Sequence, residues 1–164
     1  MRILLTLAAL ALGGCGFQLR GTASLPFETL YMAPTSQPGV ALDLKRNIQS
    51  GTSTRLVDDP KKADAILDLT TEAREKVILS LAATGRVREY QLRYRVGFRV
   101  RDAKGGEFVP ATTVQLTRDV TYSDTDVLAK ESEEQLLYRD MQSDLVQQIM
   151  RRLAAAQPPK PAQQ

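Results

Sequence analysis

The side chains best suited to chemistry in this sequence are basic, and most of them lie in one stretch. Between positions 86 and 101 a single acid, Glu89, stands among six arginines: Arg86, Arg88, Arg93, Arg95, Arg99 and Arg101. Guanidinium groups bind phosphates and carboxylates through paired hydrogen bonds. A hydrated surface more often mixes the two signs. We therefore predict that Arg93, Arg95, Arg99 and Arg101 face either an anionic partner or the polar interior of a large β-barrel. The alternative is an ordinary solvent-exposed face of the sheet.

A further basic residue, Lys130, is distant in sequence but is expected at the same end of the molecule as Arg86 and Arg88. Residues 63–79, 86–101 and 107–122 read as three strands joined by short turns. The turn at 82–85 and the end of the third strand then lie together, and the last helix begins there. We predict a phosphate-binding site for an anionic amphiphile from Lys130, Arg86 and Arg88. Ordinary surface ion pairs between these arginines and Glu89 or Glu133 are the alternative.

Residues that most enzymes need are missing from the chain. It has no histidine, which removes the commonest general base and the commonest zinc ligand. No serine is followed by lysine at Ser-x-x-Lys spacing, and no glycine-rich phosphate loop follows a predicted strand. The acids at 58–59, and Asp124 with Asp126, suit a turn and a helix cap better than a metal site. We therefore predict a protein that is not an enzyme and has no metal or cofactor.

The one cysteine, Cys15, follows a short apolar stretch and two glycines. Residues 1–14 consist of a charged start, an apolar run and small residues, which is typical of an export signal. The run is about half of the ~20 residues that span a bilayer. We predict a lipoprotein signal peptide over 1–14 and acylation of Cys15, with an ordinary signal peptide as the alternative. Several acyl chains on one cysteine give a stable membrane anchor.

After Cys15, the apolar periodicity of the chain predicts one domain. Residues 15–27 read as a lipidated tether and 28–156 as a single folded unit, with a disordered, proline-rich tail over 157–164. Residues 28–33 form a short strand, residues 40–50 a helix and residues 55–57 a further extended segment, which suggests a crossover onto one sheet. From residue 63 to 79 the odd positions are expected to face the core. A long helix carries the apolar stripe from Leu128 to Leu153, with N-cap candidates Asp124, Thr125 and Asp126.

These elements predict an α+β fold in two layers. Two helices cover one face of a four-stranded, mainly antiparallel sheet. The net charge of +3 is too small to indicate nucleic-acid binding, and none is predicted.

Five short motifs, in order, resemble the LptE family of lipopolysaccharide-assembly lipoproteins. They are Cys15-Gly16-Phe17-Gln18-Leu19-Arg20-Gly21, Ala63-Asp64-Ala65-Ile66-Leu67, Glu89-Tyr90-Gln91-Leu92, Leu128-Ala129-Lys130-Glu131, and the spaced set Met141, Asp144, Gln147, Gln148, Ile149, Arg152 and Leu153. Together they cover residues 15 to about 156. The resemblance implies a one-to-one complex with the outer-membrane barrel LptD. It also implies that the lipoprotein plugs the barrel lumen, helps the barrel to assemble and assists delivery of lipopolysaccharide.

The resemblance also implies roles for particular residues. Cys15 matches the lipidated position, and Lys130 matches a base that contacts lipopolysaccharide. The family's other basic contact falls in the turn before Glu89, where this chain has Ala83 instead. Arg86 or Arg88 is expected to substitute for it.

The residue after Cys15 indicates where the lipoprotein is expected to reside. Gly16 follows Cys15, where an aspartate typically retains lipoproteins at the inner membrane. The expected location is therefore the outer membrane, on its periplasmic side and in the barrel lumen. The alternatives are a free-standing lipoprotein that carries an anionic amphiphile, and a scaffold for another envelope machine.

Overall fold

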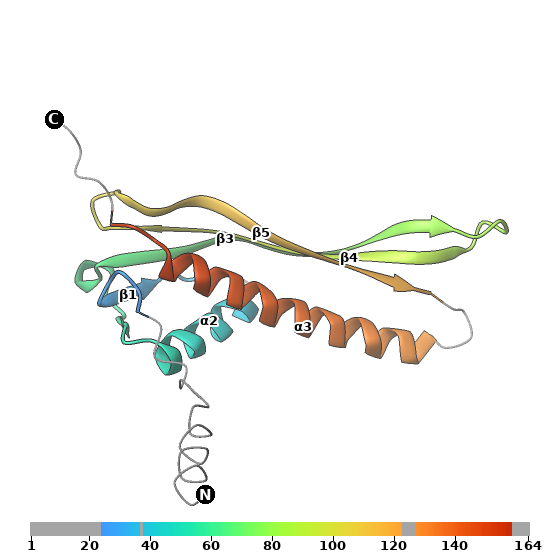
Figure 1. The fold of residues 1–164 in the computed structure, drawn as a ribbon, viewed down its shortest axis with the longest axis horizontal. Coiled ribbons are helices and arrows are strands. Elements are labelled where there is room, and N and C mark those ends of the chain that lie inside the picture. Colours follow the sequence, from blue (N-terminus) through green and yellow to red (C-terminus); the bar gives the residue numbers. More distant parts are fainter. Residues whose placement is uncertain (1–23, 37, 123–126, 159–164) are drawn as a thin grey trace, which may run out of the picture.

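The computed structural model describes residues 24–36, 38–122 and 127–158. Within these ranges lie five strands, two α-helices and a short 3-10 helix (Figure 1). In chain order they are β1 (Thr29–Met32), α2 (Pro38–Gly51), β2 (Arg55–Leu56), η2 (Pro60–Lys62), β3 (Ala65–Leu81), β4 (Val87–Arg101), β5 (Glu107–Thr121) and α3 (Val127–Ala154). Both predicted helices are therefore present, and each predicted long strand has its counterpart.

The strands form one mixed sheet in the order β2-β1-β3-β4-β5. β1 runs parallel to both β2 and β3, whereas β3, β4 and β5 form the antiparallel meander expected from their short turns. The prediction of a four-stranded, mainly antiparallel sheet is therefore wrong in strand number, and the sheet is mixed, with two parallel pairs. The fifth strand is β2, which lies within the extended segment expected at residues 55–57; it is only Arg55 and Leu56, and it joins the sheet through long-range pairing with β1.

α2 forms the crossover between the parallel strands β1 and β2. Val40, Leu44 and Ile48 recur every four residues and are fully buried, as a single apolar stripe on a helix should be. Asp64, just before β3, accepts hydrogen bonds from the backbone N–H of Thr29 (2.9 Å) and from its hydroxyl (2.8 Å). These bonds hold the pKa of Asp64 below its usual range and tie the start of β1 to β3.

The long strands are joined by tight turns, each of which contains a glycine with positive φ. Gly85 (φ +79°) lies between β3 and β4, and Gly105 (φ +90°) lies between β4 and β5. Residues other than glycine rarely adopt this backbone conformation. In the second turn the Asp102 carboxylate accepts from the N–H of Lys104 (2.8 Å) and of Gly106 (2.7 Å), as aspartate does in many turns.

Both helices lie on the same side of the sheet, and α3 runs along much of its length (Figure 1). The core between the layers is made by even-numbered residues of β4 and by one stripe of α3. The β4 residues are Leu92, Tyr94, Val96, Phe98 and Val100, and the α3 residues are Tyr138, Met141, Leu145, Val146, Ile149 and Leu153. The two-layer architecture is thus the predicted one.

The folded unit begins earlier in the sequence than predicted. Leu25 and Phe27, which we placed in the tether, are buried in the core, and the Phe27 ring packs edge-on against Phe108 at 5.6 Å. The predicted signal peptide, Cys15, the cap candidates Asp124, Thr125 and Asp126, and most of the predicted tail lie outside the described residues.

Candidate functional site

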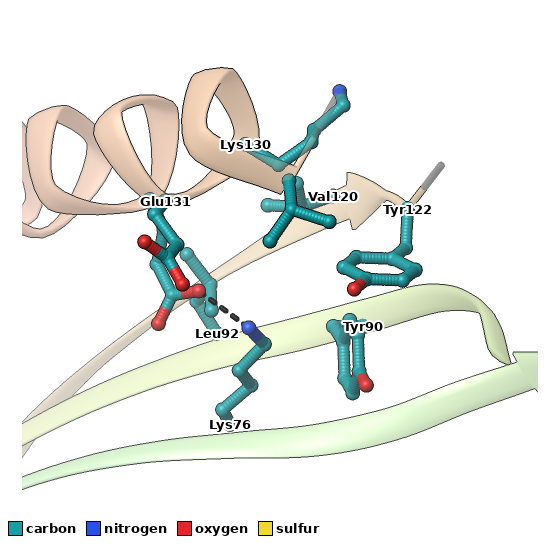
Figure 2. A pocket seen from close by; sticks show the side chains of 9 residues that line it. Lys76, Tyr90, Leu92, Val120, Tyr122, Lys130 and Glu131 are labelled. Atoms are coloured by element: carbon teal, nitrogen blue, oxygen red, sulfur yellow. Dashed lines mark hydrogen bonds and ion pairs between the residues drawn. The ribbon is translucent and has the colours of Figure 1, made fainter. Parts of the chain in front are cut away.

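The start of α3 and the ends of the long strands enclose a small pocket of about 130 Å³ (Figure 2). Its lining joins aromatic and apolar side chains to two lysines and two glutamates: Lys76, Tyr90, Leu92, Val120, Tyr122, Val127, Lys130, Glu131 and Glu134. Among these residues, only Lys130 is a predicted site residue. The pocket lies at the end of the molecule where the β3–β4 turn, the last residues of β5 and the first turn of α3 were expected to meet.

A β-bulge in β3 places Lys76 in this pocket. Before the bulge, odd residues face the helices, and Leu69 lies opposite Phe98. The register shifts between Leu69 and Thr71, so the even residues Glu72, Arg74 and Lys76 then lie opposite Val96, Tyr94 and Leu92, on the helix-facing side. The prediction that odd positions face the core along all of residues 63–79 is therefore wrong beyond the bulge.

Two tyrosines and an ion pair hold the pocket together. The rings of Tyr90 and Tyr122 meet edge to face, with centroids 5.5 Å apart. The Lys76 ammonium lies 4.4 Å from the centre of the Tyr90 ring and 2.5 Å from a Glu134 carboxylate oxygen, so it joins β3 to α3. On the next turn of α3, burial and the nearby Glu134 carboxylate raise the pKa of Tyr138, whose hydroxyl donates to the Glu75 carbonyl at 2.9 Å.

Lys130 lies on the first turn of α3 and is largely shielded from solvent. Its side chain is 24% exposed, and its ammonium pairs with Glu133, one turn further on, at 2.8 Å. Figure 2 shows the end of this side chain directed away from Lys76 and Tyr90. The Glu133 carboxylate, which we had considered as an alternative partner for Arg86 or Arg88, is thus paired with Lys130.

Arg86 and Arg88 are both exposed, at the tip of the β3–β4 hairpin and at the start of β4. The backbone N–H of Tyr122 donates to the Arg88 carbonyl at 2.8 Å, so Arg88 lies beside the last residues of β5. Tyr122 also lines the pocket with Lys130. Glu89, the other acid that we had considered, accepts a hydrogen bond from the Ser80 hydroxyl at 2.6 Å.

Exposed apolar side chains, which are not among the predicted site residues, surround this end of the molecule. Ile78 is 53% exposed, Leu79 is 48% exposed and Leu81 is 57% exposed, while Leu128 at the start of α3 is 80% exposed. The signal was present in the sequence, because three consecutive apolar residues at 77–79 cannot all face one side of a strand. Exposed apolar groups beside cations suit an amphiphile with acyl chains and phosphates.

The remaining arginines of β4 lie on the sheet face that the helices leave uncovered, and most of them have acidic partners. Arg95 pairs with Glu75 at 2.6 Å, and Asp68 binds both Arg99 at 2.8 Å and Arg101 at 3.0 Å. Arg93 donates to the side-chain carbonyl of Gln91 at 2.8 Å. The excess of positive charge along the strand is therefore partly balanced across strands, because Asp68 and Glu75 of β3 supply two acids for these four arginines.

The described residues contain no group of three or more His, Cys, Asp or Glu side chains arranged to hold a metal ion. No helix in the part of the chain that the structure describes is long and apolar enough to cross a membrane.

Comparison with known proteins covers nearly all of the described domain. Residues 27–153 match the family model LptE, described as lipopolysaccharide-assembly. The chain is 30% identical over 156 residues to the LPS-assembly lipoprotein LptE of Yersinia enterocolitica, spanning 93% of this chain and 74% of that protein. It is 27% identical over 154 residues to the LPS-assembly lipoprotein LptE of Pectobacterium atrosepticum, spanning 92% and 83% of the two chains.

Solved structures of bacterial lipoproteins share the fold. The solution structure of an uncharacterised lipoprotein B from Nitrosomonas europaea superposes with a TM-score of 0.75 at 42% identity, over 85% of this chain and 91% of that one. The crystal structure of rare lipoprotein B from Shewanella oneidensis gives 0.67 at 26% identity, over 77% and 94%. From the match across residues 27–153 and these relatives, the chain belongs to the LptE family of lipopolysaccharide-assembly lipoproteins.

Proposed function

We propose that this protein is an outer-membrane lipoprotein that forms a one-to-one complex with the LptD β-barrel. It occupies the barrel lumen from the periplasmic side, helps the barrel to assemble and assists delivery of lipopolysaccharide to the cell surface. The family match over residues 27–153 is the observation that carries this proposal. In this role residues 1–14 are removed, Cys15 is acylated, and the folded domain acts by binding and not by catalysis.

Within that complex, the end of the molecule formed by Arg86, Arg88 and Lys130 contacts the phosphates of lipopolysaccharide. The exposed side chains of Ile78, Leu79 and Leu81 lie on the same hairpin as the two arginines and contact its acyl chains. Guanidinium and ammonium groups bind phosphate oxygens through charge-assisted hydrogen bonds. Arg93, Arg95, Arg99 and Arg101, on the uncovered face of the sheet, face the polar wall of the barrel.

The complex is tested by affinity purification of the lipidated protein from detergent-solubilised envelopes without crosslinking. We expect a stable partner of about one copy per lipoprotein that is a large β-barrel. Recovery of the lipoprotein alone, or with lipid only, would contradict the plug function and favour a free-standing carrier of an anionic amphiphile. Recovery with a different envelope complex would favour a scaffold.

Lipopolysaccharide contact is tested by the double variant Lys130→Asp with Arg86→Asp, assayed for binding of purified lipopolysaccharide. The expected result is a loss of binding by at least about tenfold, since two cations become anions beside phosphate groups. The matched control reverses two exposed cations elsewhere, Lys45→Asp with Arg151→Asp, on the two helices. Equal binding by the test and control variants would remove this role and leave only the plug.

A further inference from the structure

Most of β3 is an open sheet edge, although the strand order places β3 inside the sheet. β1 pairs with β3 only at Ala65, Ile66 and Leu67, and the last main-chain bond on that side runs from the Ala33 N–H to the Leu67 carbonyl at 2.9 Å. Pro34 follows and has no N–H to donate. In the described part of the chain, β4 is the sole strand paired with β3 from Asp68 to its end.

Two adjoining hollows run along this edge and leave room beside it. One, of about 330 Å³, is lined by Pro34, Thr35, Ser36, Leu69, Thr70, Thr71 and Glu72. The other, of about 700 Å³, is lined by Ser36, Pro38, Gly39, Glu72, Ala73, Arg74 and Glu75. Because Ser36 and Glu72 belong to both, the hollows form one groove between β3 and the segment that leads into α2. We call it the β3-edge groove.

Three charged side chains line the groove, and each makes a contact within the molecule. Arg74 donates to the Gln142 amide oxygen at 2.6 Å, Glu75 pairs with Arg95 at 2.6 Å, and one Glu72 carboxylate oxygen accepts from the Tyr94 hydroxyl at 2.5 Å. The other Glu72 oxygen, Oε2, is buried and has no partner among the described residues. The Glu75 carbonyl accepts from the Tyr138 hydroxyl, so the rest of the main chain is what β3 chiefly offers to a ligand. A strand edge presents N–H and C=O groups at a repeat of about 3.3 Å per residue, and an extended polypeptide is the ligand that matches this repeat.

We propose that the β3-edge groove receives an extended segment of the β-barrel partner, which adds to the sheet beside residues 69–77. The segment would lie beside β3 in line with β1, beginning where the pairing of β1 with β3 ends, next to Pro34. This inference rests on the barrel complex proposed above and assigns one surface of it. Beyond Lys76 the exposed Val77 and Ile78 point to opposite faces of the strand, so the bound segment carries apolar residues at that end.

The opposite edge of the sheet provides an internal control. β5 is also an edge strand by the strand order, but it contains Pro110, which cannot donate a ladder hydrogen bond. Both edges carry charged residues, whereas residues 69–77 of β3 contain no proline, which is one device by which edge strands resist pairing. The two edges therefore differ in their capacity to accept another strand.

Amide hydrogen exchange in the purified lipoprotein–barrel complex, compared with the isolated lipoprotein, tests the proposal directly. We expect exchange over residues 69–77 to slow by at least about tenfold in the complex, because edge N–H groups become hydrogen-bonded. Exchange over β5 should change much less. A complex in which residues 69–77 exchange as fast as in the isolated protein overturns the inference and leaves the barrel complex standing. Recovery of no barrel overturns both.

A pair of matched substitutions gives a second measurement. Val77→Lys puts a charge on the β3 edge, and Thr117→Lys puts the same charge on an exposed position of β5. Both should melt like the unmodified protein, while Val77→Lys alone lowers retention by the barrel at least about tenfold. If the barrel retains the two variants equally, the groove does not bind a segment of the barrel. If exchange over residues 69–77 slows because the isolated lipoprotein forms a dimer, a second copy of the lipoprotein occupies the groove instead.

Discussion

At the scale of single residues, Tyr94 of β4 belongs to a polar network between the sheet and the helices. Its hydroxyl donates to a Glu72 carboxylate oxygen at 2.5 Å and accepts from Arg74 at 3.1 Å. The Arg74 guanidinium also lies 4.6 Å from the centre of the Tyr94 ring. These contacts gather charged groups of β3 beneath α3, where Gln142 links them to Asp43 of α2 at 2.5 Å. The network thus joins both helices to the sheet.

Tyr94→Phe should destabilise the domain by about 1–3 kcal/mol, the usual cost of leaving a buried polar group without its partner. The other Glu72 carboxylate oxygen, Oε2, is buried and has no hydrogen-bond partner among the described residues, so the loss falls on a group that is already poorly paired. Urea unfolding at neutral pH measures the change. Tyr31→Phe is the control, because the Tyr31 hydroxyl makes no hydrogen bond with the described residues. This substitution should leave the free energy of unfolding nearly unchanged.

The same tyrosine should make stability fall at alkaline pH. Burial, followed by the hydrogen bond to Glu72, raises the pKa of Tyr94 from 10.0 to about 12. Between these values the unfolded chain has lost the phenolic proton and the folded chain keeps it, so the free energy of unfolding decreases as pH rises. Absorbance at 295 nm should show late-titrating tyrosine, which Tyr94→Phe reduces, leaving the contribution of Tyr138, whose pKa is also raised. Ionisation of all five tyrosines in one step near 10 would contradict the burial argument.

At the scale of secondary structure, the bulge in β3 decides which side chains reach α3. It is accommodated by Gly97 on the neighbouring strand, where an added Cβ would lie 2.7 Å from the Thr70 hydroxyl oxygen and 3.4 Å from the Thr71 Cβ. A β-bulge often meets a glycine where two backbones approach closely. Gly97 therefore permits the shift that brings Arg74 and Lys76 under the helix.

Gly97→Ala should destabilise the sheet by about 1–3 kcal/mol through this steric conflict, as overpacking does elsewhere. Thr70→Ala removes the conflicting oxygen, so the double variant should recover a large part of the loss. Thermal unfolding of both single variants and the double variant gives the coupling energy. Additive effects would mean that Thr70 is not the group in conflict with the new methyl.

At the scale of the whole molecule, α3 is the element that holds the two layers together. Its apolar stripe packs on β4 and β5, and Gln147 reaches Asn47 of α2 at 3.3 Å. The salt bridge of Lys76 to Glu134 secures its first half, and the fully buried Leu145 lies in its second half. Because α3 contacts both the meander and the parallel β1–α2–β2 unit, we expect these parts to unfold together.

Leu145→Ala should lower the free energy of unfolding by about 2–5 kcal/mol, the range for truncating a buried leucine. Circular dichroism of the helices and tyrosine fluorescence from the sheet should report one shared transition. Leu136→Ala, at a position that is 52% exposed on the same helix, is the control and should stay within about 0.5 kcal/mol. Separate transitions for the two probes would show that the layers unfold independently.

Local pattern in the sequence was enough to predict the helices, the long strands and the two-layer core. The spacing of Val40, Leu44 and Ile48 and the alternation from Tyr90 to Val100 are read within a few residues, and burial of one face follows from them. The absence of histidine and the arginine-rich stretch were likewise visible. The family resemblance rested on short motifs whose residues are contiguous or closely spaced.

Tertiary structure alone decided three features, each of which depends on residues far apart in the chain. The two-residue β2 gains its place by pairing with β1, and the bulge at Thr70 reverses which side of β3 faces the helices. The acids that balance the β4 arginines come from the neighbouring strand. Strand pairing and register are set by contacts across the sheet, so a local pattern fixes which residues alternate but not which partner each one meets.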